Sequence, residues 1–234
     1  HSKMFLNDWN DLNKQIEIIL NGIKNDKKII IPFPLLSLVD DPQKHKENSI
    51  LFANTYVPIL SNNFKTKTTD NSKINIGYFS ADLNAHAVSQ LMHKMFRIHD
   101  KKKFQIYCYA FGLKEKDEVH KNIEKNVDFY RDIRDIADHE AALVAREDEI
   151  DIAIDLQGYT GKQRSGIFAN RAAPIQINYL GYPGTMGAKF IDYIIADENL
   201  IPEKNQKFYS EKIIYMPDSY QVQDDELKAA EITP

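Results

Sequence analysis

The chain of 234 residues can bury a sizeable core, and its 43% hydrophobic and 11% aromatic content excludes an intrinsically disordered protein. Its 30 Lys and Arg against 34 Asp and Glu give a net charge of −4 without a long basic run, which argues against a nucleic-acid-binding protein. The single cysteine, Cys108, excludes an internal disulfide bond and favours the cytoplasm. Because no apolar segment is long enough to cross a bilayer, we expect no membrane contact.

The start of the chain predicts an amphipathic helix followed by an extended segment. Apolar residues recur three and four positions apart from Trp9 to Ile23, and Asn7 or Asp8 is the predicted cap of this helix. Two prolines interrupt the apolar residues of 29–39, which predicts an extended piece there. The apolar stripe of the helix must pack on another part of the molecule.

A second helix is predicted to begin at Asp41 and Pro42, which supply a cap and a first-turn proline, and to run to about Tyr56. The polar residues of 61–72 indicate a linker. We therefore divide the chain into a helical lead (1–62), a linker (63–72) and an α/β half-domain (73–234).

Strands alternate with helices of about ten residues through the α/β half-domain. The predicted strands cover 74–79, 104–111, 127–130, 150–156, 174–180, 192–197 and 213–216. The predicted helices cover about 86–96, 115–125, 136–147 with Asp135 as cap, and a short piece around Gln206. This alternation predicts a Rossmann-like, doubly wound parallel sheet.

Two glycine-bearing turns stand out in the second half of the chain. Six of the nine glycines fall between Gly158 and Gly187, and five of these lie in turns at 158–161 and 181–187 that each follow a short apolar run. In open parallel sheets, ligands bind beyond the carboxyl ends of the strands. We predict that the two turns form two walls of one pocket, although ordinary β-turns explain the pattern equally well.

The turn after the first strand carries Asp82 and His86 and lacks both the dinucleotide-binding and the P-loop glycine patterns. A helix start favours a neutral imidazole at His86, and Asp82 could orient that ring or accept a proton. From spacing alone, a capping or solvated role for both is the better-supported interpretation. Of the carboxylates around strand 150–156, we expect at most Asp155 near a ligand, and no residue cluster has the spacing of a metal site.

Several segments resemble the protein O-linked N-acetylglucosamine transferases, with their SPINDLY relatives and bacterial homologues. The matching segments are SADLNAHAV at 80–88, GYT at 158–160, APIQ at 173–176, LGYPGT at 180–185, DYIIAD at 192–197 and YSEKIIYMP at 209–217. Their order and spacing make the resemblance specific, and it covers most of the chain.

The resemblance implies the first Rossmann-like half of a GT-B-type glycosyltransferase. Such enzymes move a sugar with inversion onto Ser or Thr hydroxyls of a protein or peptide acceptor, without a metal or other cofactor. The implied donor is UDP-GlcNAc, although the SPINDLY branch uses fucose. The second catalytic half, which holds most of the nucleotide, and tetratricopeptide repeats are expected outside these residues, so the chain alone is expected to be inactive.

Carried over by position, Asp82 and His86 match active-site residues of this family. The resemblance assigns substrate positioning to His86 and a debated role as proton acceptor to Asp82. The implied sugar- and acceptor-binding residues are Tyr159, Thr160, Leu180, Gly181, Pro183, Gly184 and Thr185. Family members often carry Asn where this chain has Ala85, with Asn84 one position earlier, which affects one polar contact to the sugar or the acceptor.

Two other functions remain open from the sequence. One is a non-catalytic module of the same fold that binds a peptide or a partner protein. The other is a sugar-nucleotide epimerase-like enzyme, which also uses Rossmann domains. The LGYPGT segment at 180–185 favours the transferase over the epimerase.

Overall fold

Seven parallel strands form the centre of the described structure, in the order β3-β2-β1-β4-β5-β6-β7. The computed structural model describes residues 3, 6–60, 73–112 and 117–226. The strands are β1 (Ile74–Ser80), β2 (Phe104–Ala110), β3 (Phe129–Asp132), β4 (Ile152–Asp155), β5 (Ile175–Asn178), β6 (Tyr193–Ala196) and β7 (Lys212–Tyr215). The sheet grows in one direction from β1 to β3 and in the other from β4 onward, so its order reverses between β1 and β4. The predicted doubly wound, Rossmann-like sheet is confirmed.

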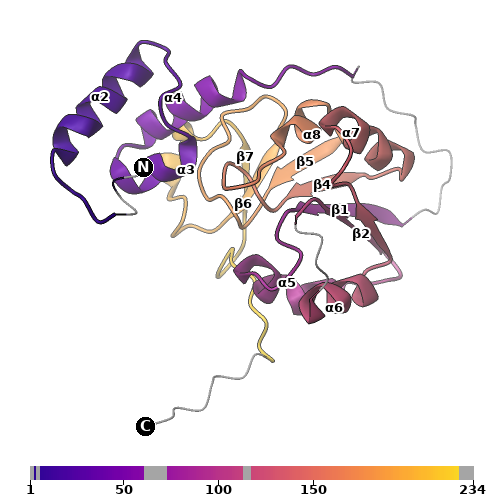
Figure 1. Ribbon diagram of the computed structural model, residues 1–234. Coiled ribbons are helices and arrows are strands. Elements are labelled where there is room, and N and C mark those ends of the chain that lie inside the picture. Colours follow the sequence, from indigo (N-terminus) through magenta and orange to yellow (C-terminus); the bar gives the residue numbers. More distant parts are fainter. Residues whose placement is uncertain (1–2, 4–5, 61–72, 113–116, 227–234) are drawn as a thin grey trace, which may run out of the picture.

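Helices cover both faces of this sheet (Figure 1). The covering helices are α5 (Ala87–Ile98), α6 (Glu118–Asn126), α7 (Asp138–Glu147) and α8 (Ser165–Ala169), and a 3₁₀ helix, η1 (Glu203–Phe208), lies between β6 and β7 in the chain. Residues of α5 and α6 share one buried cluster with the sheet, and residues of α7 and α8 share the other. In doubly wound sheets, ligands bind beyond the carboxyl ends of the strands at the point where the strand order reverses, and here those strands are β1 and β4.

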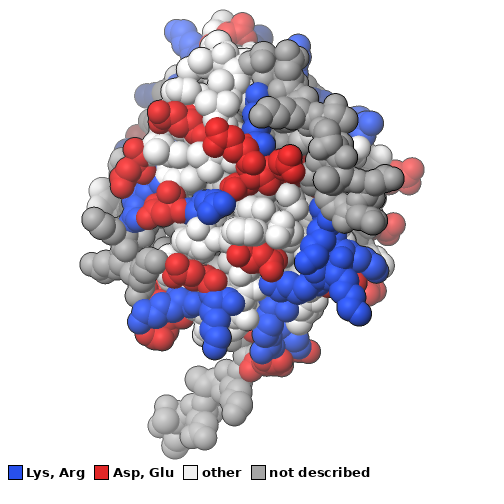
Figure 2. Space-filling view, turned by 90° about the vertical axis from the view of Figure 1, so that its right-hand side faces the viewer, with Lys and Arg blue, Asp and Glu red and all other residues white. Residues whose placement is uncertain are grey.

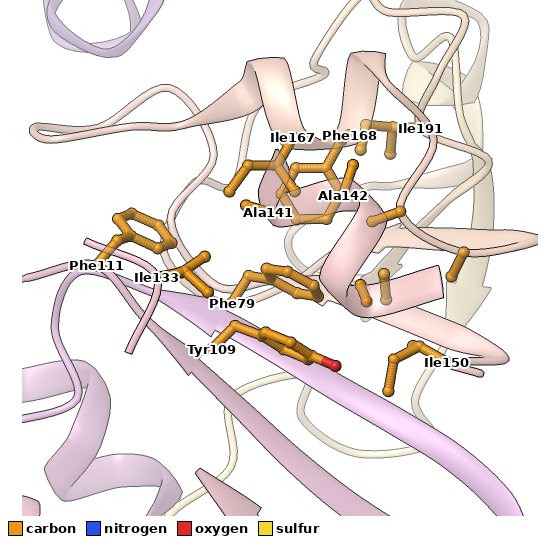
Figure 3. Close-up of a cluster of buried hydrophobic side chains, with 14 of the residues drawn as sticks. Phe79, Tyr109, Phe111, Ile133, Ala141, Ala142, Ile150, Ile167, Phe168 and Ile191 are labelled. Atoms are coloured by element: carbon orange, nitrogen blue, oxygen red, sulfur yellow. The ribbon is translucent and has the colours of Figure 1, made fainter. Parts of the chain in front are cut away.

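Alternate residues of β1 face the two helical layers. Tyr78 packs edge-on against Phe96 of α5, with 5.3 Å between the ring centroids. Its neighbour Phe79 points to the opposite face, where it stacks on Tyr109 at 4.3 Å and meets Phe168 of α8 at 5.3 Å (Figure 3). The central strand therefore anchors both halves of the hydrophobic core.

The helical lead lies against the body on the α7 and α8 side of the sheet. It contains α2 (Leu12–Lys24), α3 (Pro32–Leu38) and α4 (Pro42–Ala53). Phe52 of α4 packs edge-on against Tyr159 at 5.0 Å, and Ala53 belongs to the same buried cluster as Phe79. The predicted linker at 63–72 lies outside the described residues, so the division of the chain into domains stays a prediction.

Two expectations for the lead are wrong. The segment predicted as extended, 29–39, contains the helix α3. Pro32 occupies the first position of that helix, where a backbone N–H has no partner within the helix and proline is tolerated. The predicted amphipathic helix is α2, which begins only at Leu12, so neither Asn7 nor Asp8 is its cap.

The predicted cap of the next helix is confirmed. Asp41 precedes α4, and its carboxylate accepts hydrogen bonds from the backbone N–H groups of Gln43 at 2.9 Å and Lys44 at 3.2 Å. This satisfies two of the N–H groups that a helix start leaves unpaired. The helix ends at Ala53, one turn before the predicted end at Tyr56.

The body differs from the sequence expectations mainly at element ends. Helix α7 follows Ala137, whose backbone N–H donates to the side chain of Glu140 at 2.7 Å, so Asp135 is not its cap. Strand β3 lies two residues later than the predicted 127–130. The five-residue helix α8 was not predicted, because it is too short to show a helical period.

The surface carries charges of both signs. On the face that Figure 2 shows, Lys and Arg gather in several groups that Asp and Glu interrupt, and the residues described there form no unbroken basic surface. Among the helices of the described residues, none combines the length and apolar character needed to cross a bilayer.

The packing of β1 makes Phe79→Ala a severe core substitution. We expect it to lower the free energy of unfolding by about 3–5 kcal/mol, because it removes a fully buried ring that contacts two others. Ile98→Ala, at a side chain that is 64% exposed, is the control and should change it by less than about 0.5 kcal/mol. Urea denaturation of the two variants measures both values, and equal losses would contradict this account of the core.

Candidate active site

The turns that follow β1 and β4 meet where the strand order reverses. The parallel register sets Phe79 opposite Asp155, so both turns leave the sheet at the same level. The buried side chain of Gln157, in the second turn, reaches the first turn. Its amide oxygen accepts hydrogen bonds from the Ala81 N–H at 3.1 Å and from Ser80 Oγ at 3.3 Å. One side chain therefore joins the two turns.

The amide nitrogen of Gln157 binds two of the predicted site residues. It donates to Asp82 Oδ2 at 3.0 Å, to Thr160 Oγ1 at 2.9 Å and to the backbone oxygen of Gly161 at 2.7 Å. Two hydrogens serve these three acceptors, so one of the bonds is shared. The sequence analysis missed Gln157, although its place between a strand end and a glycine turn was a usable signal.

His86 is the N-cap of α5, as its spacing suggested. Its Nδ1 accepts a hydrogen bond from the Val88 N–H at 3.3 Å, and Asp82 Oδ2 lies 3.7 Å from the same nitrogen. Because Nδ1 accepts a hydrogen, the hydrogen-bond pattern assigns the ring proton of the neutral form to Nε2. The side chain is 46% exposed, so this ring can donate a hydrogen bond to a ligand atom.

The backbone of Asp82 is held as firmly as its carboxylate. Its N–H donates to Ser80 Oγ at 2.9 Å, and its carbonyl oxygen accepts from Ser89 Oγ of α5 at 2.5 Å. The side chain is 16% exposed, which leaves the carboxylate within reach of a ligand from one side. Asp82, His86 and Thr160 are therefore the predicted residues that the structure brings together.

Asp155 lies beneath the second turn. Its Oδ1 accepts hydrogen bonds from the backbone N–H groups of Gln157 at 2.9 Å and Gly158 at 3.0 Å. The residue is only 2% exposed, and burial raises the pKa of its carboxyl group to about 6. Gly158 has φ +53°, and a Cβ there would lie 2.3 Å from the Cβ of Tyr182, so glycine is required at this turn.

The second glycine turn lies directly against the first. A Cβ on Gly181 would come within 2.1 Å of the Leu156 backbone oxygen, so the two walls touch at this point. Leu180, just before it, adopts a positive φ of 70° and packs against the buried cluster on the α5 side. The two turns are therefore adjacent, and that they form two walls of one ligand pocket stays a prediction.

The end of the second glycine turn, 181–187, is fixed by a buried acid. Thr185 Oγ1 donates to Glu211 Oε2 at 2.7 Å, and the Met186 N–H donates to Glu211 Oε1 at 2.6 Å. Burial raises the pKa of Glu211 despite these bonds. A hollow of about 200 Å³ beside this turn is lined by Leu36, Pro42, His45, Pro183, Gly184, Thr185, Leu200, Phe208 and Tyr209.

Tyr159 lies in the core and not at the surface of the site. It is 0% exposed, and its ring packs between Phe52 and Tyr182, with centroids 5.0 and 5.6 Å away. Burial raises the pKa of its hydroxyl, which has no hydrogen-bond partner among the described residues. The Tyr159 side chain therefore supports the turn from inside, and a substrate-binding role for this residue stays a prediction.

The residues that the structure describes contain no group of three or more His, Cys, Asp or Glu side chains able to hold a metal ion. That the chemistry needs no metal stays a prediction.

The sequence model of Glycosyl transferase family 41 matches residues 50–232. The chain belongs to this family. Membership confirms the resemblance found in the sequence and goes against the epimerase alternative.

Similar proteins of known name agree with this assignment. The chain is 32% identical over 228 residues, 95% of its length, to the probable UDP-N-acetylglucosamine–peptide N-acetylglucosaminyltransferase SEC of Arabidopsis thaliana, and 32% identical over 159 residues, 64% of its length, to the probable enzyme SPINDLY of Petunia hybrida. It covers 23% and 17% of these two proteins, so it spans less than a quarter of their length.

A solved structure agrees with the family 41 fold. A mutant of the Thermobaculum terrenum O-GlcNAc transferase superposes with a TM-score of 0.72 and 27% identity, over 77% of this chain and 35% of that chain. The fold implied by the resemblance, a Rossmann-like sheet of a GT-B-type glycosyltransferase, is thereby confirmed.

Burial of Asp155 predicts a distinct pH dependence of stability. The folded pKa of about 6 exceeds the usual value near 3.9, so the unfolded chain ionises first and stability falls as pH rises from about 4 to 6. Asp155→Asn removes this contribution and keeps an acceptor oxygen. We expect the free energy of unfolding of the variant, relative to the unchanged chain, to rise by on the order of 3 kcal/mol between pH 4 and pH 7.

Urea denaturation at several pH values measures this difference. If the substitution lowers the free energy of unfolding by the same amount at every pH, the plot of this free energy against pH shifts without a change of slope. A difference that does not vary with pH would show that the Asp155 carboxyl group titrates normally.

Proposed function

We propose that this chain forms the first half of the catalytic region of an inverting glycosyltransferase that moves N-acetylglucosamine from UDP-GlcNAc to Ser or Thr hydroxyls of proteins. The observation that carries the proposal is the Asp82 carboxylate, which Gln157 holds 3.7 Å from His86 Nδ1 at the switch point of a family 41 fold, while Ser89 holds the Asp82 backbone. The names of two relatives, both UDP-N-acetylglucosamine–peptide N-acetylglucosaminyltransferases, support the donor and the acceptor class.

Transfer to a hydroxyl needs a proton acceptor and a group that orients the reacting oxygen. In this proposal Asp82 accepts the proton, because it is a carboxylate with one side open to a ligand. His86 donates a hydrogen bond from Nε2 to a substrate oxygen and thereby positions it. Gln157 keeps Asp82 in place through a neutral hydrogen bond, which fixes its orientation without adding a positive charge.

The remaining contacts of the proposed site come from the two glycine turns, 158–161 and 181–187, and from other parts of the protein. Thr160, Leu180, Gly181, Pro183, Gly184 and Thr185 are proposed to line the sugar and acceptor site. Stabilisation of the leaving diphosphate is assigned to a second catalytic half, in place of a metal ion. Tetratricopeptide repeats and a cytoplasmic location belong to the same proposal, as does the inactivity of these 234 residues alone.

Replacement of the proposed proton acceptor tests this function in the complete enzyme. Asp82→Asn keeps an oxygen that can accept from Gln157 but cannot take up a proton, so we expect kcat to fall by about 10²–10⁴-fold. His86→Ala should also lower kcat, because it removes the Nε2 donor. Transfer of labelled sugar to a peptide measures both effects.

Asp135→Asn, at an exposed carboxylate after β3, is the matched control and should leave kcat unchanged. If the Asp82→Asn enzyme turned over as fast as this control, Asp82 would not be the proton acceptor. Unchanged transfer in both the Asp82 and the His86 variants would favour the alternative in which this part of the enzyme binds a peptide or partner and takes no part in the chemistry.

A further inference from the structure

We propose that Asp117 is a positioning residue for His86, because its carboxylate fastens the turn that carries His86 to the start of α6. Asp117 Oδ2 accepts a hydrogen bond from the Ala85 N–H at 2.6 Å, and Oδ1 accepts one from the His120 N–H at 2.8 Å. Ala85 directly precedes His86. This inference rests on the proposed function, in which the position of the His86 ring matters for transfer.

The two helices that Asp117 connects pack on the same face of the sheet. Helices α5 and α6 lie side by side there (Figure 1). His86 has an extended backbone, with φ −135° and ψ 155°, and its ring folds back to cap α5 through Val88. The hydrogen bond at the Ala85 N–H fixes the Asn84–Ala85 peptide plane, which lies one residue before His86.

Asp117 completes the attachment of the turn between β1 and α5. The beginning of the turn is held by Gln157, which accepts from the Ala81 N–H and donates to Asp82. The end of the turn is held by Asp117 at Ala85. Gln157 follows β4 and Asp117 precedes α6. Each end of the turn is therefore hydrogen-bonded to a side chain from another part of the fold.

Only a carboxylate serves both contacts at this position. Ser, Thr and Asn also cap helices, since each offers one acceptor to the first turn. Asn at position 117 would use its oxygen for His120 and would direct its NH₂ group at the Ala85 N–H, which is a donor facing a donor. Backbone hydrogen bonds from His120 and Ala85 hold the pKa of Asp117 below its usual range, so it is charged at neutral pH.

The test replaces this carboxylate by an amide and compares it with a cap elsewhere. Asp117→Asn keeps the cap of α6 and loses the Ala85 contact. The matched control is Asp41→Asn, since Asp41 caps α4 in the same way through Gln43 and Lys44 and contacts no part of this turn in the described hydrogen bonds.

Two readouts separate positioning from stability. In the 234-residue chain, we expect amide hydrogen exchange at Ala85 to speed up at least about fivefold in Asp117→Asn and to be unchanged in Asp41→Asn. In the complete enzyme, we expect kcat of Asp117→Asn to fall about tenfold or more, with the KM for the donor within about twofold. Asp41→Asn should change neither kinetic constant.

Each contrary result has its own meaning. Unchanged exchange at Ala85 would show that Asp117 does not hold the turn, and faster exchange with unchanged kcat would show that the turn does not position a working His86. Either result overturns the inference. If Asp82→Asn also leaves transfer intact, the failure lies in the proposed function; if Asp82→Asn abolishes transfer, it lies in the role of Asp117 alone.

Discussion

The candidate site depends on the side chain of Gln157. Strand order places the turns after β1 and β4 next to each other, but backbone topology alone does not fix the side chains on them. Gln157 does so, because its oxygen accepts from the first turn while its nitrogen reaches Asp82 and Thr160. The buried side-chain amide forms hydrogen bonds through both its oxygen and its nitrogen. It therefore has no unpaired polar atom and can hold a single geometry in the protein interior.

The packing around the sheet supports that geometry from both faces. Phe79 leads into the first turn and stacks on Tyr109, and Asp155, its partner across the sheet, accepts two N–H groups of the second turn. The helical lead adds to this support, since Phe52 of α4 packs against Tyr159 within the second turn. Apolar packing and hydrogen bonds hold the two turns in place, while the side chains of Asp82 and His86 stay partly exposed to a ligand.

The sequence predicted the sheet better than the details of the site. Alternating apolar runs were enough for the strands and for α5 to α7, because those elements bury periodic faces. Helix α3 was missed because its prolines occupy first-turn positions, which resemble a break when read without tertiary contacts. Asp82, His86 and Thr160 were predicted together, whereas Gln157 and Asp117 act through long-range hydrogen bonds that leave no local pattern. The burial of Tyr159 likewise depends on the lead packing over it.

The measurement that tests this account most directly is the turnover of the complete enzyme with Gln157→Leu. Leucine has a similar volume but makes none of the hydrogen bonds that join the two turns. Loss of that geometry predicts a fall in kcat of about 10²-fold, with the far-UV spectrum of the α/β fold retained. A kcat within about twofold of the unchanged enzyme would contradict the claim that Gln157 organises the site.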